Sequence, residues 1–92
     1  MAEFLLELYV PRGDAAGAER DAAAARLAAD ELRREGSAVR YVRSIFMPED
    51  ETCLLLYEAS SAAEVRRAAE LASLPAERIV EAATITERGA AS

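Results

Sequence analysis

The stretch from Ser37 to Ala59 constrains the fold more than any other part of the chain. It contains two runs of strand-forming residues, 38–47 and 51–59, and the turn Pro48-Glu49-Asp50 joins them. The centre of the second run, CLLLY, is apolar on both alternating faces, which predicts a central strand of a covered sheet. The hairpin therefore needs other elements to shield it.

An alanine-rich segment before the hairpin has the spacing of a helix. Asp14 predicts the N-cap, the helix runs to about Arg34 or Glu35, and Gly36 suits the position after its last turn. The stripe expected to face the sheet is Ala18, Ala22, Ala25, Ala28, Ala29 and Leu32. These small side chains allow the helix to lie close to the sheet.

A second helix follows the hairpin, and a strand is predicted at each end of the chain. Ser61 and Glu64 form a capping box, and the helix runs to about Ala72. Residues 3–10 alternate between a fully apolar and a mixed face, and residues 77–86 also have strand character. The order of elements is therefore β-α-β-β-α-β.

This order predicts an α+β, ferredoxin-like domain, in which two helices cover one face of a four-stranded antiparallel sheet. The chain of 92 residues forms a single domain, residues 1–92, with an ordered core of about 3–86. The polar tail, residues 87–92, is expected to fray. Much of the hydrophobic content is alanine, so the core is thin, and we expect a homodimer that forms a dimeric α+β barrel.

The charge of the chain excludes some classes of partner. The formal net charge is −6, and all of the cationic side chains are arginine. This balance opposes binding to nucleic acid and to an anionic membrane surface. The chain also has no apolar run of membrane-spanning length and no signal-like start, so we expect a cytoplasmic protein.

The face of the sheet away from the helices is the predicted ligand-binding surface. Simple alternation places three sets of residues there: Leu5, Glu7 and Tyr9; Tyr41, Arg43 and Ile45; and Ile79, Glu81 and Ala83. Such a half-apolar, half-ionisable lining suits a small molecule. The candidate ligand-binding residues are Glu7, Tyr9, Tyr41, Arg43 and Glu81.

Each candidate has a chemical role and a structural alternative. Arg43 could bind a carboxylate, phosphate or enolate, Glu7 could act as a base, and Tyr9 or Tyr41 could donate a hydrogen bond. Alternatively, Arg43 forms an ion pair with Glu7 or Glu81 across the sheet or across a dimer interface. No catalytic residue is assigned.

The other reactive or charged residues are predicted to have structural roles. Cys53 lies in an apolar strand and is predicted to be a buried small hydrophobe; as the single cysteine it excludes an internal disulfide. The segment Glu49-Asp50-Glu51 is predicted to be a solvated turn, with a weak hard-cation site as the alternative. Residues 11–17 contain glycines before a helix but lack the spacing and lysine of a phosphate loop. They are therefore predicted to be a connecting loop.

Several short motifs resemble a family of small bacterial ferredoxin-like proteins that includes nickel-binding members. The resemblance covers about residues 3–86. It rests on Glu7 followed by Pro11, on YVRS at 41–44, on the acidic turn, on YEA at 57–59, and on EVRRAA at 64–69 leading to LPAERIVE at 74–81. It implies the ferredoxin-like fold and a homodimer.

The chain departs from the pattern of that family at the metal ligands. Arg43 stands where the family has histidine in the second strand, and Ala68 stands where it often has another. The strand-three cysteine of the family corresponds to Leu55, so Cys53 is not its match, and the chain contains no histidine. We therefore expect no nickel site and no cofactor, since imidazole is the usual nickel ligand.

Three classes of function remain open at this point. The favoured one is a ligand-binding or regulatory homodimer, which predicts a cavity without a poised acid–base pair. The alternative is a small cofactor-free enzyme, such as an isomerase, cyclase or oxygenase, which predicts that Glu7 and Arg43 converge on one substrate atom. The third is a domain whose exposed sheet docks another protein.

Overall fold

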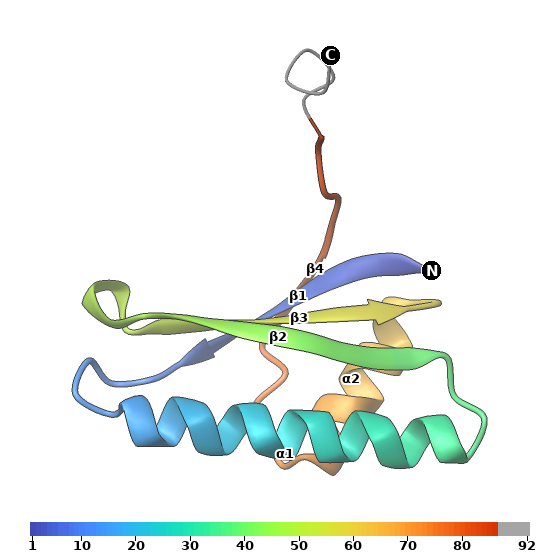
Figure 1. Cartoon of the computed structure of the whole chain (residues 1–92), viewed down its shortest axis with the longest axis horizontal. Helices are drawn as coiled ribbons and strands as arrows, with labels where there is room; N and C mark the ends of the chain where they lie inside the picture. Colours follow the sequence, from blue (N-terminus) through green and yellow to red (C-terminus); the bar gives the residue numbers. More distant parts are fainter. Residues whose placement is uncertain (87–92) are drawn as a thin grey trace.

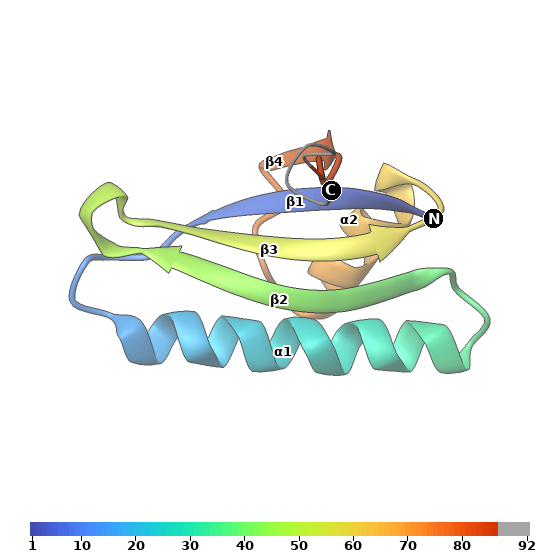
Figure 2. The ribbon, with the colours of Figure 1, turned by 45° about the horizontal axis from the view of Figure 1, so that its top comes forward.

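The structure, a computed structural model, describes residues 1–86 and has the predicted β-α-β-β-α-β order. The elements are β1 (Ala2–Tyr9), α1 (Ala15–Arg34), β2 (Val39–Met47), the 3₁₀ turn η1 (Pro48–Asp50), β3 (Thr52–Ala59), α2 (Ala62–Leu71) and β4 (Arg78–Ala82). The four strands are antiparallel in the order β2-β3-β1-β4. Both helices lie on one face of the sheet, which confirms the predicted ferredoxin-like fold (Figure 1, Figure 2).

The core lies between the sheet and the helices. In β1 and β3 every second residue is buried, as expected for strands with one covered face. The largest fully buried side chains are Tyr57, Leu6, Leu55, Val39, Val65 and Cys53. The helices contribute mainly alanines, namely Ala18, Ala25, Ala28 and Ala29 from α1 and Ala68 and Ala69 from α2.

The ends of α1 follow the local sequence. The Asp14 carboxylate accepts a hydrogen bond from the Gly17 backbone N–H at 2.9 Å, which confirms the predicted N-cap. A Cβ at Gly17 would lie 2.2 Å from that carboxylate, so glycine leaves room for the cap. Gly36 has a φ of +96°, the left-handed conformation expected just after a helix.

The capping box of α2 forms only in part. The Ser61 hydroxyl accepts from the Glu64 N–H at 3.4 Å. The Glu64 carboxylate instead accepts a hydrogen bond from the Ser37 hydroxyl, in the loop before β2. Glu64 thus ties α2 to the neighbouring loop rather than closing the box.

A β-bulge in β2 changes which residues face the helices. Tyr41 lies opposite Tyr57, but Arg43 lies opposite Leu56, so Val42 is an extra residue in the ladder. Before the bulge Val39 and Tyr41 face the helices, and after it Ser44 and Phe46 do. The prediction that Tyr41 shares a face with Arg43 is therefore wrong, because an inserted residue reverses the alternation.

Strand β4 is shorter than the predicted 77–86 and has the opposite phase. Val80 lies opposite Leu5, whereas Ile79 lies opposite the buried Leu6. The open face therefore receives Arg78, Val80 and Ala82 rather than Ile79, Glu81 and Ala83. The strand ends at Ala82, which pairs with Glu3, one residue short of the start of β1 at Ala2. The chain then leaves the sheet on the side away from the helices (Figure 1).

Candidate functional site

The open face of the sheet contains three of the five candidate residues. Glu7, Tyr9 and Arg43 occupy positions whose neighbours along the strand face the helices. Tyr9, at the end of β1, is 69% exposed. Binding of a ligand to these residues stays a prediction.

The remaining two candidates lie on the helix side. The bulge at Val42 turns Tyr41 under the helices, where its ring meets that of Tyr57 edge to face with centroids 5.9 Å apart. Glu81 lies opposite Phe4, a buried core residue, so it also belongs to the helix side, where its side chain is exposed beyond the core. Glu81 therefore shares no site with Arg43 in the same chain, whereas Tyr41 and Arg43, on opposite faces of β2, both line a cavity at the edge of that strand.

Strand pairing aligns the open-face residues in rows across the sheet. One row, from β2 to β4, is Arg43, Leu56, Leu5 and Val80. The next is Ile45, Leu54, Glu7 and Arg78. We call Leu5, Ile45, Leu54, Leu56 and Val80 the sheet-face patch. Ile45 is 45% exposed and the other four are half-buried, so no helix of the described chain covers this apolar surface.

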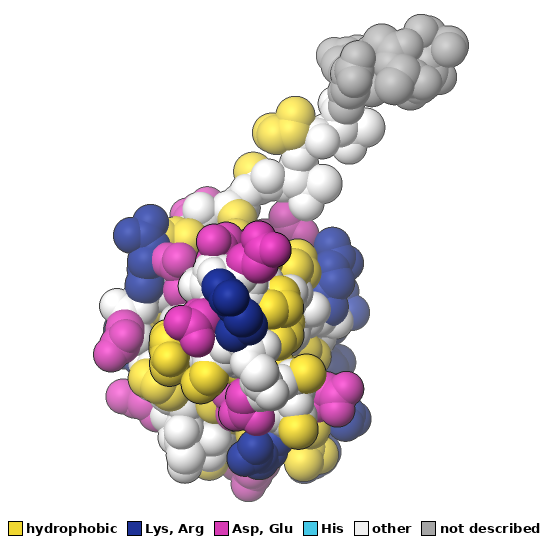
Figure 3. Space-filling model, turned by 90° about the vertical axis from the view of Figure 1, so that its left-hand side faces the viewer, with side chains coloured by type: hydrophobic (Ala, Val, Ile, Leu, Met, Phe, Trp, Pro, Cys, Tyr) yellow, Lys and Arg dark blue, Asp and Glu magenta, His cyan; other side chains and the backbone are white. Residues whose placement is uncertain are grey.

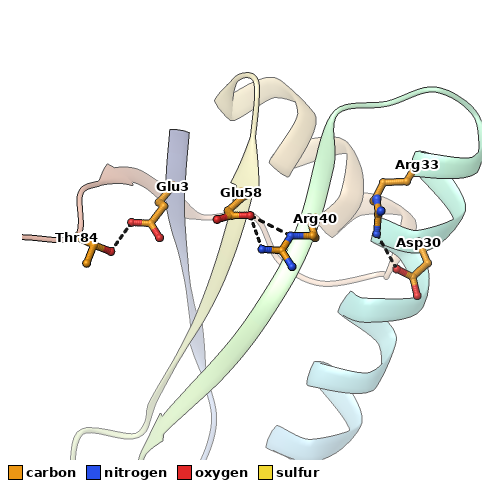
Figure 4. Close-up of polar contacts among 6 residues, drawn as sticks. All are labelled: Glu3, Asp30, Arg33, Arg40, Glu58 and Thr84. Atoms are coloured by element: carbon orange, nitrogen blue, oxygen red, sulfur yellow. Dashed lines mark hydrogen bonds and ion pairs between the residues drawn. The ribbon is translucent and has the colours of Figure 1, made fainter. Parts of the chain in front are cut away.

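Ion pairs flank the sheet-face patch. On one side Arg40 binds Glu58 through two hydrogen bonds of 2.5 and 2.9 Å, and Glu3 accepts one from Thr84 at 2.7 Å (Figure 4). On the other side Glu7 pairs with Arg78. Arg43 forms no ion pair within residues 1–86, so the predicted pairing with Glu7 or Glu81 is absent from the described chain. Its guanidinium is open to a partner or ligand.

The arrangement does not bring Glu7 and Arg43 together, as the alternative of a cofactor-free enzyme requires. Glu7 and Arg43 are separated by the whole of β3 and by two residues along the strands, which puts their Cα atoms roughly 12 Å apart. The Glu7 carboxylate is also engaged by Arg78. Within one chain these two side chains therefore do not converge on one substrate atom.

The end of the sheet near the turn carries a shallow depression. It has a volume of about 340 Å³, and its lining includes Glu7, Tyr9, Thr52, Glu77 and Arg78. Acidic and basic side chains alternate with hydrophobic ones over the end of the molecule that carries η1 and the start of α1 (Figure 3). This surface therefore presents neither a continuous basic stripe nor a single acidic field.

Two buried ionisable groups have raised pKa values. Burial raises the pKa of the Tyr57 hydroxyl far above its usual value, and the neighbouring Tyr41 adds to the rise. Burial likewise raises the pKa of the Cys53 thiol; Asp21 adds to this, and a hydrogen bond with Ser44 partly opposes it. Cys53 is free and fully buried, as predicted. Both groups stay protonated near neutral pH, which disfavours a nucleophilic role for Cys53.

The described residues do not fit a nickel site of the kind built from imidazoles. The chain has no histidine, and no group of three or more aspartate, glutamate or cysteine side chains within residues 1–86 is placed to hold a metal ion. In the same part of the chain, no helix has both the length and the apolar character to cross a membrane. We derive no metal chemistry for this chain.

Fold and site together define a ferredoxin-like α+β domain with an apolar, charge-flanked open sheet face. The comparisons with known proteins narrow this class. The chain belongs to the SCO4226-like family, described as nickel responsive protein SCO4226-like, whose model matches residues 4–82. This confirms the resemblance seen in the sequence.

A solved structure supports the same assignment. The crystal structure of SCO4226 from Streptomyces coelicolor A3(2) aligns with a TM-score of 0.71 and 25% sequence identity, covering 92% of this chain and 100% of the other. A search of curated proteins finds no match.

Proposed function

We propose that this protein is a cytoplasmic homodimer that holds a small ligand between two open sheet faces. The sheet-face patch carries the proposal, because it places five apolar side chains on a surface that no helix of the described chain covers. Exposed apolar patches rimmed by charge mark interaction sites. Packing against a second copy would remove this surface from water.

The size of the face suits a small dimer. Four strands about 4.8 Å apart, with 8, 9, 8 and 5 residues in β1 to β4, cover roughly 500 Å² before the relief of the side chains is counted. Standard interfaces bury about 800 Å² per partner. The segment 83–86, which includes the 86% exposed Ile85, leaves the sheet on the same side and would add to the contact.

The ligand we propose is a small anion rather than nickel. Arg43 occupies the position where the resemblance places a histidine, and its guanidinium has no ionic partner within residues 1–86. A permanent cation repels a metal ion but binds a carboxylate or phosphate with paired hydrogen bonds. The family is described as nickel responsive. In this member the open sheet face would be retained, and it would bind an anion in place of nickel.

The dimer can be tested with a matched pair of variants. We expect Leu56→Asp to convert the protein to a monomer, measured by light scattering after gel filtration, because it buries a carboxylate in the interface. Leu27→Asp is the control, since Leu27 is 62% exposed on α1; it should stay dimeric. A wild-type protein that is monomeric at high micromolar concentration would refute the proposal.

The ligand is tested by calorimetry with inorganic phosphate, acetate and nickel chloride. We expect heat from an anion in the wild type that is lost in Arg43→Gln, and no saturable heat from nickel. Micromolar nickel binding would overturn the assignment of an anion site. Cell fractionation checks the cytoplasmic location.

A further inference from the structure

A second cavity lies on the opposite side of the sheet, between the first half of α1 and the edge strand β2. Its volume is about 470 Å³, within the roughly 300–1,000 Å³ of small-molecule sites. One wall is formed by residues of α1, namely Ala15, Ala18, Glu19 and Ala22, and the other by residues 41–44 and Phe46 of β2, which include Arg43. Cys53 lies at its floor, since it lines the cavity yet is fully buried.

The alanines of α1 explain why this space is not filled. Their side chains end at Cβ, so over the first turns the helix places little volume in the gap above the strands. Further along α1, Leu32 is buried and belongs to the same core cluster as Tyr57 and Val39. The cavity is therefore confined to the N-terminal half of α1.

The bulge at Val42 supplies the polar part of the cavity. In a regular strand, residues three apart point to opposite faces, but the extra residue brings Tyr41 and Ser44 to the same face. Their hydroxyl oxygens lie 2.6 Å apart. Each hydroxyl has one donor and two acceptor positions, so one proton lies between the pair and, even with the contact of Ser44 to Cys53, acceptor positions stay open to a donor on a ligand.

We propose that this cavity binds a compact neutral molecule with an apolar body and one hydrogen-bonding oxygen, such as a phenol. The alanine and phenylalanine walls suit the apolar body, and the Tyr41–Ser44 pair suits the oxygen. The lining holds one carboxylate, that of Glu19, and one guanidinium, that of Arg43, so its side chains carry no net charge of their own, which suits a neutral ligand. An isolated cation would lose hydration against the apolar walls. Every lining residue belongs to one chain, and only Arg43 also borders the open sheet face.

The first test is a fluorescence titration with N-phenyl-1-naphthylamine, a neutral apolar probe. We expect saturable binding of one probe per chain. Ala22→Leu should weaken it at least tenfold because the larger side chain enters the cavity. Ala23→Leu, one residue along and exposed, should bind within twofold of the wild type. Ala15→Leu is a second plug at an exposed position of the lining, in case Ala22→Leu does not fold.

The second test separates the contribution of the Tyr41 and Ser44 hydroxyls to binding from that of the apolar walls. The competitors p-cresol and p-xylene have nearly the same shape but differ by a hydroxyl. We expect p-cresol to displace the probe at least fivefold better, and the double variant Tyr41→Phe/Ser44→Ala, which lacks both hydroxyls, to remove that preference. Leu56→Asp should bind the probe like the wild type, whether or not the protein dimerises. Absence of saturable probe binding, wild-type affinity in both plug variants, or equal displacement by the two competitors would overturn the proposal.

Discussion

The hydroxyl of Tyr57 offers the sharpest test of the packing described above. Tyr57 is fully buried in β3, and its Oη has no hydrogen-bond partner among the described residues. An unsatisfied buried polar group costs about 1–3 kcal/mol. Replacing Tyr57 with phenylalanine removes the hydroxyl and retains the ring. We therefore expect Tyr57→Phe to stabilise the protein by about 1 kcal/mol or more.

The same substitution at Tyr41 is the matched control. The Tyr41 hydroxyl is engaged with Ser44 at 2.6 Å, so its removal should destabilise the protein by about 0.5–1.5 kcal/mol. In a domain of this size 1 kcal/mol shifts Tm by about 4–8 °C. Urea unfolding and thermal unfolding, followed by circular dichroism at one fixed protein concentration, would resolve both shifts and keep any dimerisation constant.

The test is decided by the signs of the changes in the free energy of unfolding in Tyr57→Phe and Tyr41→Phe. Opposite signs, with Tyr57→Phe stabilising and Tyr41→Phe destabilising, support the structure. A loss of about 1 kcal/mol or more in Tyr57→Phe would refute the reasoning, because it would mean that the buried hydroxyl makes a favourable hydrogen bond.

Three further predictions concern pH, thiol chemistry and the helix ends. In the unfolded chain Tyr57 ionises near pH 10, whereas its raised pKa keeps it protonated in the fold, so stability should fall above pH 10 by up to about 1.4 kcal/mol per pH unit. Tyr57→Phe should flatten that part of a stability-against-pH curve, and an unchanged slope would contradict it. Cys53 should resist a thiol reagent at neutral pH in the native protein and react in urea; rapid native labelling would argue against its burial. Asp14→Ala should lower the free energy of unfolding in urea by about 1 kcal/mol, because the α1 N-cap is lost. Gly36→Ala should lower it by a similar amount, because alanine is strained at the positive φ of this position. If both variants were as stable as the wild type, neither end would stabilise the helix.

The identity and order of the elements could be predicted from the sequence because their signals are local. Asp14 and Gly36 bound α1 through their own side-chain and backbone preferences, and the alternation in β1 matches the buried positions of that strand. The apolar run from Cys53 to Tyr57 correctly indicated a central strand, since β3 lies between β2 and β1. The fold class follows from these local signals together.

The faces taken by the candidate residues were predicted only in part, and both errors concern the phase of an edge strand. Glu7, Tyr9 and Arg43 lie on the open face as expected, whereas Tyr41 and Glu81 do not. In β4, apolar residues at 79, 80, 82 and 83 give no clear alternation, so only pairing with β1 sets the phase. In β2, nothing in the local sequence marks Val42 as the extra residue. The cavity beneath α1 was missed for the same reason, since it depends on that bulge.

The sequence by itself determined which helices and strands form, their order, and the two ends of α1, because caps, turns and periodicity act within a few residues. The tertiary structure decided which way each side chain of the edge strands points, because one extra residue reverses the face and only the pairing partner fixes the register. It also decided that Glu7 binds Arg78 and leaves Arg43 without an ionic partner within residues 1–86. The open sheet face and the cavity under α1 both follow from long-range pairing that no local pattern contains.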